Sequence, residues 1–222
     1  MTGASQSASG SPLTVGLDIG TTSCKAVLVD DHGEVLGRCR MSSGLIAGEG
    51  TFRHDAAESW WELPRRALAQ VAAGFGERIA GVAVCAPVPS LAPVGPEGRP
   101  LGPGLLYGDE HSRPPVGDRV SRGAKRPPSD DPTASAEMLH MATWASRAFP
   151  HAEGFWPAQA VANASLSGEG VLDLASAFGT GSLYNGAGWD EPTCAAAGIV
   201  PSKLPRVAVF GEPVGRVRSA LV

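Results

Sequence analysis

The residues best suited to chemistry lie close together near the start of the chain, between Asp18 and Lys25. An apolar strand expected at Leu13–Leu17 leads into Asp18, and the tight turn Gly20-Thr21-Thr22 follows. Glycine lets the backbone approach a ligand closely, so the N–H groups of the turn and the two threonine hydroxyls can point at phosphate oxygens. A carboxylate beside them can hold a magnesium ion or its waters, which neutralise charge on a transferring phosphate. The stretch therefore predicts a phosphate-binding loop with a magnesium ligand.

Three strands must position this loop. A second strand is expected at Ala26–Val29, a β-turn at Asp30-Asp31-His32-Gly33, and a third strand at Val35–Arg40. The alternative interpretation is an ordinary hairpin in which Asp18 and the threonines bond only within their own turn. The lengths of the flanking strands favour the phosphate loop.

The run Asp18, Gly20-Thr21-Thr22-Ser23, Lys25 and Val29-Asp30 resembles the first phosphate motif of the actin/Hsp70/sugar-kinase superfamily. It is most similar to the FGGY family of carbohydrate kinases, which includes the xylulokinase and glycerol-kinase types. The resemblance implies that Asp18 lies at the magnesium, that Gly20, Thr21, Thr22 and Ser23 touch the phosphates of ATP, and that Lys25 stands at the family's Lys or Arg. It also implies an α/β fold, the actin-like ribonuclease-H-type ATPase domain. Its mixed sheet has three antiparallel strands followed by βα units.

Later landmarks extend this resemblance over most of the chain. A Gly/Ser-rich loop is expected at Met41–Arg53, and helical periodicity follows from His54 with the pair Trp60-Trp61, which we interpret mainly as core. Pro64 predicts a kink or a helix that starts there. The apolar segment Ile79–Ala86 predicts a buried strand.

Two further carboxylates are candidates for the sugar side. Asp109 stands where the family has W-x-D, and Asp173 opens a segment that resembles the family's D-x-S-x-A. The loop Ala86–Ser90 departs from the family, because its two prolines and valine cannot hydrogen-bond sugar hydroxyls as the usual Gly-Gln does. Gly179-Thr180-Gly181 lacks the third glycine of a dinucleotide fingerprint, so we reject that interpretation.

Composition limits the classes of protein. The 222 residues are 43% hydrophobic, which predicts one domain at 13–222 behind a flexible Ser/Gly/Ala-rich tail at 1–12. The net charge of −4 argues against nucleic-acid binding, and no apolar run reaches membrane-spanning length. Four widely spaced cysteines are typical of reduced thiols, so a cytoplasmic location is expected.

We therefore expect the N-terminal, sugar-side domain of an ATP- and Mg²⁺-dependent kinase that phosphorylates a sugar or polyol hydroxyl. The family's general base would lie beyond Val222 and the C-terminal nucleotide-binding domain is not in the sequence, so the chain alone should have little turnover. A C-terminal kinase domain or a second copy of the chain is the expected protein partner. The alternative is a degenerate, non-catalytic paralogue that binds a small ligand or a partner. An actin- or Hsp70-like ATPase fits less well, because Trp60-Trp61, Trp189-Asp190 and Leu204-Pro205 resemble sugar-kinase landmarks.

Overall fold

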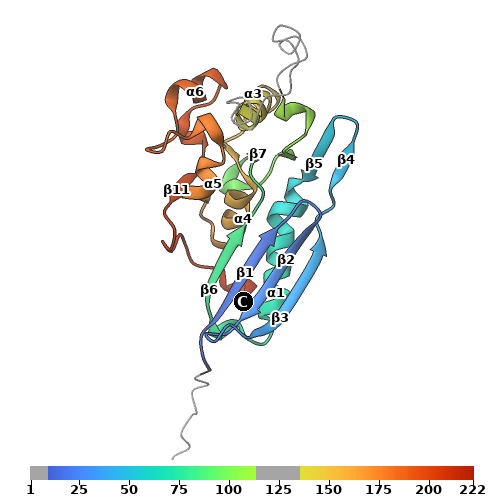
Figure 1. Ribbon diagram of the computed structural model, residues 1–222, viewed down its shortest axis with the longest axis vertical. Helices are drawn as coiled ribbons and strands as arrows, with labels where there is room; N and C mark the ends of the chain where they lie inside the picture. Colours follow the sequence, from blue (N-terminus) through green and yellow to red (C-terminus); the bar gives the residue numbers. More distant parts are fainter. Residues whose placement is uncertain (1–9, 114–135) are drawn as a thin grey trace, which may run out of the picture.

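The computed structural model describes residues 10–113 and 136–222 (Figure 1). Most of the expected tail, and all of the charged, Pro-rich segment 117–133 that the sequence predicts to be a loop, lie outside the described residues. The strands are β1 (Leu13–Ile19), β2 (Ser23–Val29), β3 (Val35–Ser42), β4 (Ile46–Gly48), β5 (Thr51–Asp55), β6 (Ile79–Cys85), β7 (Ser90–Val94), β8 (Pro103–Leu106), β9 (Gly154–Trp156), β10 (Val171–Asp173) and β11 (Arg206–Ala208). The longer helices are η1 (Ala57–Glu62), α1 (Leu63–Ala72), α3 (Glu137–Ala148), α4 (Ala158–Ser167), α5 (Leu174–Phe178) and α6 (Glu191–Ala196). Short helical turns are η2 (Gly76–Arg78), η3 (Pro96–Gly98), η4 (Glu110–Ser112), η6 (Gly181–Leu183), η7 (Pro201–Lys203) and η8 (Ser219–Leu221).

The first sheet has the order β3-β2-β1-β6. β1 pairs antiparallel with β2, β2 pairs antiparallel with β3, and β6 joins β1 in parallel. The parallel strand is reached through η1 and α1, which makes the crossover a βα unit. The fold class expected from the sequence is therefore confirmed.

One face of this sheet is covered and the other is open. Side chains alternate along a strand, and on β1 Leu13, Val15, Leu17 and Ile19 are buried while Asp18 is exposed. The buried face packs against α1 and α4, which lie on the same side of the sheet (Figure 1). Each fully buried leucine or isoleucine stabilises the fold by about 1.5–3 kcal/mol.

Pro64 was expected to mark either a kink or the start of a helix, and the segment after β5 shows both. η1 is a π-helical turn, and α1 begins at Leu63 with Pro64 in its first turn, where a missing N–H costs nothing. Trp60 and Trp61 are 0% and 2% exposed, which confirms them as core residues. Pro64 thus marks the point where one helical geometry gives way to another.

The second sheet has the order β4-β5-β8-β7-β9, and it corrects the expectation of a loop at Met41–Arg53. β3 runs to Ser42, and β4 and β5 form a hairpin around Glu49 and Gly50. Gly50 takes a φ of 72°, a left-handed conformation that glycine adopts without strain. The hairpin is stabilised by tertiary pairing, because β5 also pairs antiparallel with β8.

The expectation for Ile79–Ala86 is confirmed as a strand but wrong in burial. Ala83 and Cys85 are exposed on the open face of the first sheet, whereas Val82 and Val84 pack against the core. An apolar strand with small side chains therefore does not require cover on both faces.

A second core lies around α3. The apolar side chains of Met138, Met141, Ala142 and Ala145 on this helix are buried there, with Phe155 of β9 among their partners. β10 and β11 form a separate parallel pair. None of the helices within residues 10–113 and 136–222 is both long and apolar enough to cross a membrane.

Candidate functional site

The turn after β1 exposes hydrogen-bond donors. Gly20 N–H donates to the carbonyl of Ser23 at 2.9 Å, which closes the turn, and a Cβ at Gly20 would lie only 3.1 Å from that oxygen. Within the described part of the chain, no acceptor is found for the N–H or hydroxyl groups of Thr21 and Thr22. Ser23 differs, since it begins β2 and is only 4% exposed.

Asp18 and Lys25 lie beside this turn on the open face. They are direct cross-strand partners, and Lys25 Nζ donates to Asp18 Oδ2 at 2.9 Å. Both side chains are 52% exposed, so this ion pair contributes little to stability and either group can turn to a ligand. Both border a hollow of about 800 Å³, which is also lined by Gly16, Val27 and Ala83 among others.

The donor set fits a magnesium-bound phosphate. No group of three or more His, Cys, Asp or Glu residues gathers around a possible metal position in the described ranges. Magnesium typically takes one or two carboxylates and fills its other positions with water and phosphate oxygens, so the single carboxylate of Asp18 is sufficient. The open N–H groups of Thr21 and Thr22 and the ammonium of Lys25 complement the negative charge of phosphate.

Ser43 and His54, which were not predicted as site residues, hold the turn from its buried side. The carbonyl of Thr21 accepts hydrogen bonds from Ser43 Oγ at 2.7 Å and from His54 Nε2 at 2.8 Å. Ser43 N–H also donates to the carbonyl of Thr22 at 3.1 Å. Trp60 Nε1 donates to His54 Nδ1 at 2.8 Å, which links the turn to the core.

The burial of His54 predicts a pH dependence of stability. His54 is fully buried, and this desolvation lowers its pKa below the ordinary value, although the carbonyl of Thr21 partly opposes the effect. The unfolded chain then binds the proton more readily, so stability should be complete above about pH 6.5 and fall as the pH drops below that value. Urea unfolding between pH 8 and 5 measures this slope. The His54→Gln variant should show a shallower slope, and an equal slope would contradict the assignment.

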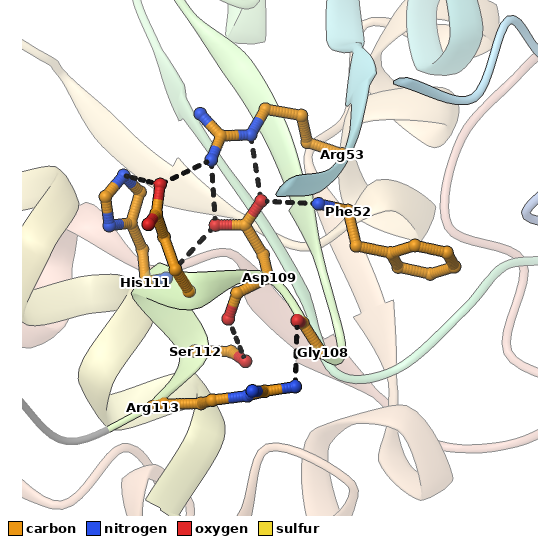
Figure 2. A network of polar contacts seen from close by, with 8 residues as sticks. Phe52, Arg53, Gly108, Asp109, His111, Ser112 and Arg113 are labelled. Atoms are coloured by element: carbon orange, nitrogen blue, oxygen red, sulfur yellow. Dashed lines mark hydrogen bonds and ion pairs between the residues drawn. The ribbon is translucent and has the colours of Figure 1, made fainter. Parts of the chain in front are cut away.

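Asp109 is the centre of a buried network (Figure 2). Its side chain is 0% exposed and lies against Arg53 of β5, whose Nε is 2.8 Å from Oδ2 and whose second guanidinium nitrogen is 3.1 Å from Oδ1. The backbone N–H groups of Phe52 and His111 supply two further hydrogen bonds at 2.9 and 3.1 Å. All four bonds are made within the protein, so Asp109 ties the β4–β5 hairpin to the segment after β8.

Asp173 lies at the end of β10 and is partly exposed. It caps α5 by accepting the N–H of Ser176 at 2.8 Å. Gln159 of α4 donates to both Asp173 Oδ2 and the carbonyl of Val84 on β6, at 2.5 and 2.8 Å. The side chain of Gln159 therefore links Asp173 to β6, the strand that pairs with β1 and lies beside Asp18.

The divergent loop Ala86–Ser90 comes directly after β6 and leads into β7. Ser90 Oγ donates to the carbonyl of Pro87 at 2.6 Å and accepts the N–H of Ala158 at 3.0 Å, so its hydroxyl is used within the fold. A Cβ at Gly179 would lie 2.7 Å from Val88 Cγ1, which places the loop against the segment after α5. The loop thus offers no side-chain amide that could hydrogen-bond a sugar hydroxyl.

The structure groups Asp18, the turn and Lys25 as the sequence predicted, and it places Asp173 on β10, joined to β6 through Gln159. Asp109 lies after β8, at the start of η4, where Arg53 of the second sheet and backbone N–H groups surround it. The part of each carboxylate in sugar binding stays a prediction, with less support for Asp109.

Comparison with known sequences settles the family. The sequence profile of the FGGY family of carbohydrate kinases, N-terminal domain, matches residues 13–123. The chain belongs to the FGGY family. It is 31% identical over 225 residues to a xylulose kinase of Streptomyces rubiginosus, an alignment that covers 96% of this chain and 46% of that protein. It is 24% identical over 198 residues to an erythritol kinase of Brucella abortus, covering 84% of this chain and 38% of that protein.

Solved gluconate and xylulose kinases share the fold. The gluconate kinase of Lactobacillus acidophilus superimposes with a TM-score of 0.79 at 19% identity, covering 96% of this chain and 45% of that one. The xylulose kinase of Rhodospirillum rubrum gives a TM-score of 0.76 at 24% identity, covering 94% and 46%. The chain thus spans about half the length of the kinases that it matches.

Proposed function

We propose that this chain is the N-terminal domain, residues 13–222, of an ATP-dependent carbohydrate kinase that transfers the γ-phosphate of ATP to a hydroxyl of a sugar or polyol. The observation that carries the proposal is the exposed Asp18–Lys25 pair beside the open turn at Thr21 and Thr22, in a chain of the FGGY family. Xylulose and erythritol kinases among the relatives support a small sugar or polyol as substrate.

In this proposal each group has one role. Asp18 holds Mg²⁺, which when bound supplies positive charge that offsets charge on the transferring phosphate. The N–H groups and hydroxyls of Thr21 and Thr22 bind phosphate oxygens, with Gly20 allowing the close approach and Ser23 closing the turn through its carbonyl. Lys25 is displaced from Asp18 and neutralises further phosphate charge.

Asp173 is proposed to contact the sugar. Asp109 contributes mainly indirectly, because it holds Arg53 and the backbone of β5 in place. We assign the general base and the remaining nucleotide contacts to a further kinase domain, since the Streptomyces relatives are about twice as long as this chain. Little or no turnover is expected from this chain by itself.

All four cysteines are free thiols, which supports a cytoplasmic location.

The first experiment measures thermal stabilisation by Mg-ATP. Ligand at ten times its dissociation constant stabilises the folded state by about 1.4 kcal/mol, so even a weak site raises the Tm of the wild type at millimolar nucleotide. Asp18→Asn should abolish most of this shift without lowering the Tm of the free chain, because the side chain is half exposed. Asp31→Asn, an exposed change in the next turn, is the matched control and should keep the shift. Equal shifts in wild type and Asp18→Asn would refute the proposed site.

A second candidate function is a non-catalytic module that binds a ligand or partner through the same edge. The observation that favours it is the Ala86–Ser90 loop, whose one hydroxyl is bonded within the fold. Under this alternative, adding a C-terminal FGGY kinase half would yield no phosphorylated sugar although Mg-ATP still binds. Phosphorylation of any pentulose or polyol in that mixture would exclude it.

A further inference from the structure

His54 is a fully buried histidine whose hydrogen-bonding roles are fixed by its partners. The indole N–H of Trp60 can only donate, so Nδ1 of His54 must accept that bond. The remaining nitrogen, Nε2, therefore carries the proton and donates to the carbonyl of Thr21 at 2.8 Å. The imidazole is a neutral bridge between the core and the back of the turn.

This bridge determines the direction of a donor on the other side of the turn. The Thr21 carbonyl and the Thr22 N–H belong to one planar trans peptide unit, in which they point in opposite directions. With the carbonyl held on the buried side by His54 and Ser43, the Thr22 N–H is directed outward. Ser43 N–H holds the carbonyl of Thr22 in the same way.

We infer that His54 is a positioning residue for phosphate binding, which orients the Thr22 N–H toward a nucleotide phosphate without touching it. The inference rests on the proposed function. Phosphate recognition by backbone N–H groups requires that they be oriented before the ligand arrives, since a turn that must reorder on binding loses affinity. Two donors to a single carbonyl provide that order.

The ordinary alternative is a histidine that only fills the core. Glutamine distinguishes the two, because its amide can also accept from Trp60 and donate to Thr21, whereas leucine fills the volume and does neither. Ser43→Ala removes only the second donor and leaves His54 in place. Leu68→Ala, a fully buried change in α1, is the control for a general loss of stability.

The experiment measures the dissociation constant of Mg-ATP by calorimetry and the hydrogen exchange of the Thr21 and Thr22 amides in the free chain. We expect His54→Gln to bind within about threefold of wild type and His54→Leu to bind at least about tenfold more weakly, with faster exchange at the turn. Ser43→Ala should show a smaller change in the same direction and provides the result if His54→Leu fails to fold. Leu68→Ala should retain affinity.

Wild-type affinity and exchange in both His54→Leu and Ser43→Ala would overturn the inference. A failure of wild type to bind Mg-ATP would instead overturn the proposed function. Hydrogen exchange at the turn then decides by itself whether His54 orders these amides.

Discussion

Replacing Arg53 with methionine is expected to lower the free energy of unfolding by about 3–5 kcal/mol, because the carboxylate of Asp109 would remain buried without its cation. Asp109 is 0% exposed and Arg53 is 19% exposed, so solvent cannot replace the guanidinium. The remaining hydrogen bonds, from Phe52 and His111 N–H, do not neutralise the charge. Urea unfolding monitored by tryptophan fluorescence measures the loss.

Two controls separate buried charge from lost packing. Asp109→Asn added to Arg53→Met removes the charge but keeps an acceptor for Phe52 N–H, so the double variant should be more stable than Arg53→Met alone. Arg66→Met breaks an exposed pair with Glu58 and should cost less than about 1 kcal/mol. If Arg53→Met costs no more than Arg66→Met, the network is not a major source of stability.

The local parts of the fold could be predicted from the sequence. Alternation on β1 and the glycine of the turn after it depend on neighbouring residues, so the sheet and the grouping of Asp18 with Lys25 followed directly. The hairpin of β4 and β5 could not be found in this way. Its Gly/Ser-rich segment becomes a strand because β8 and Asp109, more than 45 residues away, supply its partners.

The support of the site depends on contacts distant in sequence. His54 reaches Thr21 across 33 residues and Arg53 reaches Asp109 across 56, so no local spacing reveals either pair. The available signal was the polar pair Arg53-His54 just before an apolar helix, because adjacent residues of a strand point to opposite faces. Gln159, which joins Asp173 to β6, carried no signal because an amide on a helix is usually exposed.

The two faces of the first sheet differ enough that the same substitution should cost far more at one residue of β2 than at its neighbour. Leu28 is 0% exposed within the main core, so Leu28→Asp buries an unpaired carboxylate and should cost more than about 4 kcal/mol. Since a domain is typically stable by only about 5–15 kcal/mol, this variant should be largely unfolded near physiological temperature. Circular dichroism and urea unfolding measure the loss.

Val27 is the matched position, because it is partly exposed, lines the open hollow and lies opposite Arg38 in the register of β2 and β3. Val27→Asp loses some strand propensity but gains an opposite charge across the strand, so its cost should stay below about 1 kcal/mol. A large loss at Val27 as well would mean that the open face is covered in solution. Sedimentation velocity would then show whether a second copy of the chain covers it, since a charge placed in such an interface would convert dimer to monomer.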